Sequence, residues 1–109
     1  MKRKENKSAF LEYCGDTPQL RILDFFIGNH FFDFPLTEIA RESEVSYNSL
    51  KAILPQLLEK KILIISRKIG KSDYYKLNMK SIFVQNIIKV AWQLTKEDLF
   101  KERKVKISV

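Results

Sequence analysis

Apolar residues recur at spacings of three and four along much of this chain, which is the pattern of amphipathic helices. The clearest stretch is 46–60. One face of the helix predicted there is apolar and carries Leu50, Ile53, Leu54, Leu57 and Leu58. The opposite face carries short amides, hydroxyls and a lysine. The spacing therefore predicts a helix with one side in a core and a polar side facing outward.

A shorter helix is predicted just before it, over 37–42, with the Thr37 hydroxyl as its cap. Ser46 is placed to cap the longer helix in the same way. The turn between the two helices contains a single apolar residue, Val45, which we expect to be buried. Two caps so close together predict two short helices that cross at an angle.

The pattern then changes to β-branched and aromatic residues in runs too short for another helix. It predicts a β-hairpin made of a strand at 62–67, a loop at 68–73 and a strand at 74–77. The loop region is basic and contains Arg67, Lys68 and Lys71. A basic hairpin tip can reach phosphates or a minor groove.

Two further helices flank this central part. The first begins with Thr17 as cap and Pro18 at the first helical position, and it ends near Gly28. The last spans about 81–95, and its apolar residues cover a wider arc than one small core requires. We interpret the surplus as a surface for a partner. The alternative is a helix buried on both sides within one monomer.

Helix, turn, helix and a two-stranded wing, in this order, resemble the winged helix-turn-helix family of transcriptional regulators. The resemblance covers residues 17–77, and it is greatest to small archaeal-type winged-helix DNA-binding proteins in the runs Gly15–Phe25 and Ser66–Lys71. The buried positions of the family correspond to Ile39, Ala40, Val45, Leu50 and Ile53. Glu44 departs from the glycine usual in the turn, so either its backbone is left-handed or strained, or the turn has another shape.

The resemblance implies that helix 46–60 enters the major groove of double-stranded DNA and that the wing, 66–73, contacts the adjacent backbone or minor groove. The candidate DNA-binding residues are Ser46, Tyr47, Asn48, Ser49, Lys51, Ala52, Arg67, Lys68 and Lys71. Many winged-helix regulators pair through their first and last helices, so we expect a symmetric homodimer. Its expected interface residues are Phe26, Phe83, Ile87, Val90, Ala91 and Leu94.

The expected fold class is mainly α with a small β-hairpin, a winged helix-turn-helix with an extra C-terminal helix. A chain of 109 residues buries one modest core. Its expected parts are a basic N-terminal arm and lead-in (1–16), the winged helix-turn-helix domain (17–78), the C-terminal dimerisation helix (79–100) and a tail (101–109). The arm adds phosphate contacts or only solubility, and the tail is an added strand or a disordered end.

The charge of the chain favours a polyanionic partner. Twenty Lys and Arg against 13 Asp and Glu give a formal net charge of +7, which predicts salt-sensitive binding to polyanions. The alternative is a lysine-rich surface that is only solvated. The concentration of positive charge on the wing and both ends of the chain argues against it.

Signals for catalysis are weak. His30 is the only histidine, and Cys14 is the only cysteine and has no ligand at metal spacing, so no metal, cofactor, catalytic residue or internal disulfide is expected. No apolar run has the length of a membrane span, and the first residues lack the apolar core of a signal peptide. These features predict a cytoplasmic protein that is not an enzyme, and they leave a small-molecule effector open.

We therefore predict a homodimeric, sequence-specific transcriptional regulator of double-stranded DNA, and a chain with no room for an activation module favours repression. The alternative is a winged-helix protein-protein interaction module of a transcription or DNA-segregation complex. Its wing or recognition helix would contact protein instead of DNA. Alanine at the three basic wing residues separates the two, because only a DNA-binding protein then loses affinity for DNA.

Overall fold

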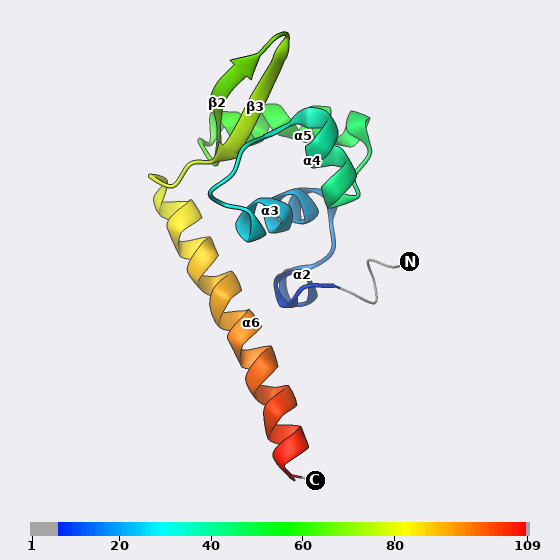
Figure 1. Cartoon of the computed structure of the whole chain (residues 1–109), viewed down its shortest axis with the longest axis vertical. Coiled ribbons are helices and arrows are strands. Elements are labelled where there is room, and N and C mark those ends of the chain that lie inside the picture. The colour runs from blue at the N-terminus through cyan, green and yellow to red at the C-terminus, as the bar shows by residue number, and fades with distance from the viewer. Residues whose placement is uncertain (1–6, 109) are drawn as a thin grey trace.

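The computed structural model describes residues 7–108, with side chains described from 7 to 100. Its elements in chain order are α2 (Ala9–Cys14), α3 (Pro18–Gly28), β1 (Phe34–Pro35), α4 (Leu36–Ser43), α5 (Tyr47–Glu59), β2 (Leu63–Ile69), β3 (Ser72–Leu77) and α6 (Ile82–Ser108). The β2–β3 hairpin projects from one end of the molecule, and α6 runs toward the other (Figure 1). This confirms the predicted class, a mainly helical fold with a small sheet.

Two of the predicted helix caps are present and one is not. The Thr17 hydroxyl accepts a hydrogen bond from the Leu20 amide at 3.2 Å, and α3 starts at Pro18 as predicted. The Ser46 hydroxyl caps α5. The prediction for Thr37 is wrong, because α4 starts one residue earlier and its N-cap is Pro35, whose side chain has no acceptor.

A side chain of α3 holds the turn between α4 and α5. Glu44 adopts the left-handed conformation, with φ 58° and ψ 45°, as one of the two predicted outcomes for a non-glycine residue there. The Arg21 guanidinium donates to the Glu44 carbonyl oxygen at 3.0 Å and to Asp16 Oδ1 at 2.6 Å. The hydrogen bond that Arg21 donates to Asp16 raises the pKa of Arg21. The next residue, Val45, is buried as predicted.

The sheet has three antiparallel strands in the order β1-β3-β2. The short strand β1 was not predicted, because two residues carry no alternation to detect. The predicted six-residue loop is wrong as well: pairing continues to Ile69 and Ser72, which leaves only Gly70 and Lys71 in the turn. Gly70 has φ 62°, as tight hairpin turns require. Arg67 and Lys68 therefore lie on a strand.

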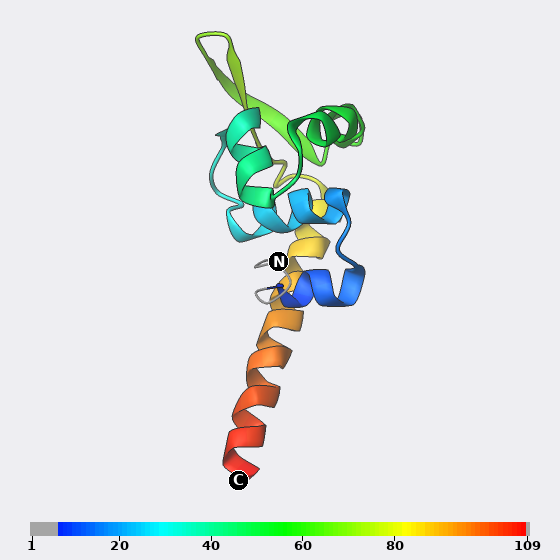
Figure 2. The same cartoon turned by 90° about the vertical axis from the view of Figure 1, so that its right-hand side faces the viewer.

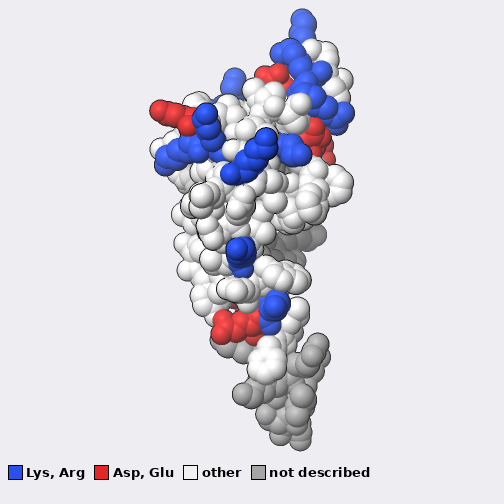
Figure 3. Space-filling model, turned by 90° about the vertical axis from the view of Figure 1, so that its left-hand side faces the viewer, with Lys and Arg blue, Asp and Glu red and all other residues white. Residues whose placement is uncertain are grey.

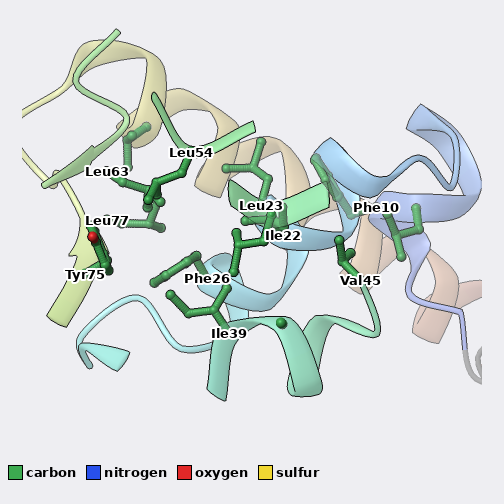
Figure 4. Packing of buried hydrophobic residues seen from close by; sticks show 14 of the residues in the cluster. Phe10, Ile22, Leu23, Phe26, Ile39, Val45, Leu54, Leu63, Tyr75 and Leu77 are labelled. Carbon is green, nitrogen blue, oxygen red and sulfur yellow. The ribbon is translucent and has the colours of Figure 1, made fainter. Parts of the chain in front are cut away.

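The core lies where α3, α4, α5 and the sheet meet, and α2 and α6 extend it (Figure 4). The Phe26 side chain is 0% exposed and has the rings of Phe25 and Phe34 beside it, at centroid distances of 5.3 and 6.0 Å. Ala91 is buried too, on the side of α6 that packs on the body. Both residues belong to the core, which corrects their expected place at a dimer interface.

Helix α2 lies within the segment expected to be an arm and lead-in. The Ser8 hydroxyl caps it by accepting from the Leu11 amide at 3.1 Å and donates to Asp24 of α3 at 2.8 Å. Phe10 and Leu11 are buried, and α2 packs beside α6 (Figure 2). The rest of the expected arm, residues 1–6, lies outside the described residues.

Helix α6 is longer than the predicted C-terminal helix. Its backbone stays helical from Ile82 to Ser108, which corrects the strand or disordered end expected for residues 101–108. The last residue of the expected tail, Val109, lies outside the described residues. The far half of α6 extends beyond the helical body along the long axis of the molecule, which measures 56 Å (Figure 2). Within the described range, none of the helices combines the length and the apolar character needed to cross a bilayer.

Candidate nucleic-acid interface

The polar face of α5 is exposed and uncovered by other elements of the described chain. Leu50 and Leu54 point into the core, which turns Tyr47, Asn48, Lys51 and Ala52 outward. Tyr47 is 44% exposed, and the Lys51 ammonium lies 5.7 Å from the centroid of its ring. A cation at this position over a ring is weakly attracted to it, so the two side chains form one surface at the start of the helix.

The two serines of the candidate set are partly occupied by the fold. The Ser46 hydroxyl accepts from the Ser49 amide at 3.1 Å and donates to the Ser49 hydroxyl at 2.9 Å. Ser49 is also half-buried. These two residues therefore shape the start of α5, and the four candidate residues beside them, Tyr47, Asn48, Lys51 and Ala52, are exposed.

The hairpin carries all three basic candidates, but they differ in how tightly they are held. Arg67 makes a bidentate pair with Asp33, with Nε to Oδ2 at 2.9 Å and Nη2 to Oδ1 at 3.2 Å. Lys68 pairs with Asp73 at 3.3 Å. Lys71 lies in the exposed turn and, within the part of the chain that the structure describes, forms no ion pair. Of these three residues, only Lys71 can reach a phosphate without giving up a carboxylate.

Asp33 anchors the hairpin to the segment before β1, and sequence reasoning missed it. Its carboxylate accepts hydrogen bonds from the Ser66 hydroxyl and from Arg67, and these bonds hold the pKa of Asp33 below its ordinary value. Arg67 also lies over the ring of Tyr74, with the guanidinium carbon 4.8 Å from its centroid. The hydrogen bonds of Asp33 with Ser66 and Arg67 therefore join the hairpin to the body.

Replacing Asp33 with asparagine is expected to destabilise the protein at neutral pH. The loss of stability should become smaller as the pH falls into the acidic range. A carboxylate whose pKa is lowered by folding contributes stability above its unfolded pKa, near 3.8, and loses it as pH falls through the lower folded value. Urea unfolding of both proteins at neutral and acidic pH measures this difference. Asp73→Asn controls for the change of charge. A difference that stays constant in acid would contradict the assignment.

Basic side chains gather on the part of the surface that carries the hairpin. Figure 3 shows Lys and Arg side chains over the upper part of the molecule, with fewer of them along α6. The exposed basic residues of α5, the hairpin and the adjoining segments are Lys51, Lys60, Lys61, Arg67, Lys68, Lys71 and Lys80. An excess of positive charge around one end of the molecule favours approach of a polyanion.

A cavity of about 570 Å³ lies apart from this surface, between α2, α3 and α6. His30 forms part of its wall, and its Nδ1 lies 2.9 Å from the carbonyl oxygen of Ile27 near the end of α3. A half-buried histidine in contact with a carbonyl at the end of a helix has a structural role there. Within residues 7–100, no three metal-binding side chains gather into one group.

Comparison with solved structures identifies the fold. No family model matches the chain, and no curated protein sequence matches it. Among solved structures, the crystal structure of NadR in complex with 4-hydroxyphenylacetate matches 94% of this chain and 71% of its own, with a TM-score of 0.65 and 13% identity. The fold is a winged helix-turn-helix. In this fold α4 and α5 form the helix-turn-helix, and β2–β3 is the wing.

Proposed function

We propose that the protein is a sequence-specific regulator of transcription that binds double-stranded DNA as a homodimer in the cytoplasm, most simply as a repressor. The recognition helix, 46–60, enters the major groove, and the wing, 66–73, contacts the adjacent backbone or minor groove. The observation that carries the proposal is that α5, whose polar face is exposed, lies beside the exposed basic wing. Figure 1 shows the two elements together at one end of the molecule.

The exposed side chains of α5 are chemically suited to base edges. The Asn48 amide can bond bidentately to adenine, Lys51 can reach guanine or a phosphate, and the methyl group of Ala52 can pack on the methyl group of thymine. Tyr47 stands at the leading edge of the same surface. These pairings are permissive, so they support DNA reading without fixing an operator.

Fluorescence anisotropy of a labelled mixed-sequence duplex, titrated with the protein at several salt concentrations, tests this function. We expect the logarithm of the affinity to fall linearly with the logarithm of the salt concentration, with a slope of about 0.9 per phosphate neutralised. Absence of binding even at low salt would contradict the proposal and favour a winged-helix module that contacts protein.

Lys71→Ala is expected to weaken DNA binding for all sequences and to lower the salt slope by about one. Lys71 is the wing cation that approaches a phosphate without breaking an ion pair. The triple variant at Arg67, Lys68 and Lys71 should lose more affinity, but it also removes the partners of two carboxylates. Lys89→Ala, an exposed change on α6, is the matched control in the same anisotropy assay. Equal slopes for Lys71→Ala and Lys89→Ala would contradict a wing contact.

The homodimer in this proposal pairs through α6. Four apolar residues follow one another there at spacings of four, three and four: Phe83, Ile87, Val90 and Leu94. Phe83 and Val90 are 50% and 43% exposed, and Leu94 is half-buried. Ile87 is half-buried as well and packs against the core of its own chain, so only part of its side chain is open to a partner. This spacing is the seam of paired helices. A two-fold dimer presents its recognition helices to successive major grooves, about 34 Å apart, and so predicts an inverted-repeat site.

A further inference from the structure

Strand β2 is an edge of the sheet and carries exposed apolar side chains. It is seven residues long and, in the strand order β1-β3-β2, has β3 on one side only. Three of its side chains, Ile64, Ile65 and Ile69, are 38%, 49% and 49% exposed. The hairpin projects from the body, so the outer side of β2 is accessible (Figure 1). We infer that this edge pairs, in antiparallel orientation, with the β2 strand of a second copy of the chain.

The hairpin turn shows which backbone groups of β2 are open near its end. Gly70 and Lys71 form a two-residue turn, so the pair that flanks it, Ile69 and Ser72, is joined by the hydrogen bond of the turn. Hydrogen-bonded and non-hydrogen-bonded pairs alternate along an antiparallel ladder. The next residue, Lys68, therefore directs its N–H and C=O away from β3, toward the outer side of the strand.

The pairing of β3 with β1 identifies a second open residue, Ile65. The partner of Ile65 in β3 is Tyr75, which also pairs with Phe34 of β1. The adjacent pair, Pro35 and Tyr74, has no N–H on Pro35 to donate, so Phe34 and Tyr75 form the hydrogen-bonded pair. The backbone groups of Tyr75 then point to β1, and those of Ile65 point outward. Among the described residues, no backbone group pairs with this outer side.

The open edge of β2 is complementary to itself. Its two outward residues, Ile65 and Lys68, lie three positions apart, so two copies related by a two-fold axis can pair Ile65 of each with Lys68 of the other. The same register sets Ile64 opposite Ile69 of the second copy, twice. These two isoleucines share one face of the sheet, because the irregularity between Ile65 and Arg67 shifts the alternation by one residue.

The charges of β2 permit this pairing. Edge strands of monomers are commonly protected by charged side chains, especially lysines, that keep another strand away. Both cations of β2 are neutralised within the chain: Arg67 pairs with Asp33 at 2.9 Å, and Lys68 pairs with Asp73 at 3.3 Å. The edge is therefore balanced in charge and apolar, and it matches another edge of the same kind better than it matches an acidic peptide. The paired stretch, 64–69, contains neither Lys71 nor any residue of α5, so the inference is independent of the proposed function.

Hydrogen exchange of the backbone amides, followed by NMR at several protein concentrations, tests the pairing directly. We expect the amides of Ile65 and Lys68 to exchange about tenfold more slowly at high than at low concentration, because pairing supplies acceptors for them. The amide of Ile69, which points to β3, should show no such dependence. Sodium chloride should strengthen the effect, because it screens the repulsion between two copies of charge +7. Exchange at Ile65 and Lys68 that does not vary with concentration would overturn the inference.

Ile69→Lys tests the side-chain part of the interface. It places an ammonium group opposite Ile64 of the second copy, twice, so we expect association at least about tenfold weaker in sedimentation experiments. The fold should be kept, because Ile69 is half-exposed in the monomer. Ile82→Lys, the same change at a residue of α6 that is 74% exposed, is the matched control and should leave association unchanged. Equal association by the two variants would overturn the pairing.

Leu94→Asp separates this interface from the proposed dimer through α6. The substitution lies in the seam of α6 and leaves β2 unchanged. Concentration-dependent protection of Ile65 and Lys68 should persist in this variant, and it would support the β2 pairing even if the wild type does not pair through α6. Loss of that protection in Leu94→Asp would overturn β2 as an interface in its own right.

Discussion

Replacing Ile87 and Leu94 together with aspartate is expected to convert the dimer into a monomer and to weaken binding to an inverted-repeat site by about a hundredfold. Both side chains lie in the apolar seam of α6, one turn on either side of the exposed Val90. In a paired helix they would face the partner, where an unpaired carboxylate is costly to bury. Each monomer would then bind a single half-site and would lose the affinity that a dimer gains from binding both half-sites together.

Sedimentation equilibrium measures the mass, and anisotropy on full and half-site duplexes measures the affinities. The matched control replaces Lys89 and Lys96 with glutamate. These residues have the same seven-residue spacing and are exposed, but they lie on another face of α6, away from the seam. This control changes the charge more than the test variant does, yet it should leave the mass unchanged. Circular dichroism tests whether both variants are folded. Ile87 also packs against the core of its own chain, so Leu94→Asp alone, which leaves that contact intact, serves as the test if the double variant unfolds. A doubly substituted protein with the wild-type mass would refute pairing through this seam.

The parts of the fold that local signals specify could be predicted from the sequence. Thr17, Pro18 and Ser46 mark helix starts through contacts within three residues, and the helices begin where these residues stand. The left-handed backbone at Glu44 is one of the two outcomes that the sequence left open for this turn. The polar face of α5 follows from the spacing of its leucines. Each of these predictions depends only on neighbouring residues.

The contacts that position the candidate site could not be predicted, because they join residues far apart in the sequence. Asp33 and Arg67 are 34 positions apart, and Arg21 reaches Glu44 across 23. No spacing rule relates such pairs, so the anchoring of the wing and of the turn was missed.

The C-terminal segment shows how a local pattern can mislead. Alternation of Val105, Ile107 and Val109 favours a strand, but the backbone is helical to Ser108. The chain has no glycine or proline after Gly70, so no helix-ending residue separates the tail from α6. A helix that is already formed adds one hydrogen bond for each further residue, whereas a lone strand needs a partner. Continuation therefore prevails over alternation.

Phe26→Ala is expected to lower the free energy of unfolding by about 3–5 kcal/mol, the usual loss for a large ring removed from a core. The ring is fully buried, with Phe25 and Phe34 beside it. A loss of this size is a large part of the stability of a small domain. Phe26→Leu, which leaves a smaller void, keeps the effect measurable if the alanine variant does not fold. Urea unfolding at several protein concentrations is the measurement.

Phe83→Ala is the matched substitution, because this ring is half-exposed on the seam of α6. Its effect should depend on protein concentration, since the stability of a dimer does and the packing of a single core does not. Phe26→Ala should therefore lose the same free energy at all concentrations, and Phe83→Ala should lose most of it where the wild type is dimeric. The reverse result would indicate that the partner binds α3 and not α6. The sequence alone makes the apolar residues of both helices suitable for a dimer interface, and only their burial within the chain distinguishes them.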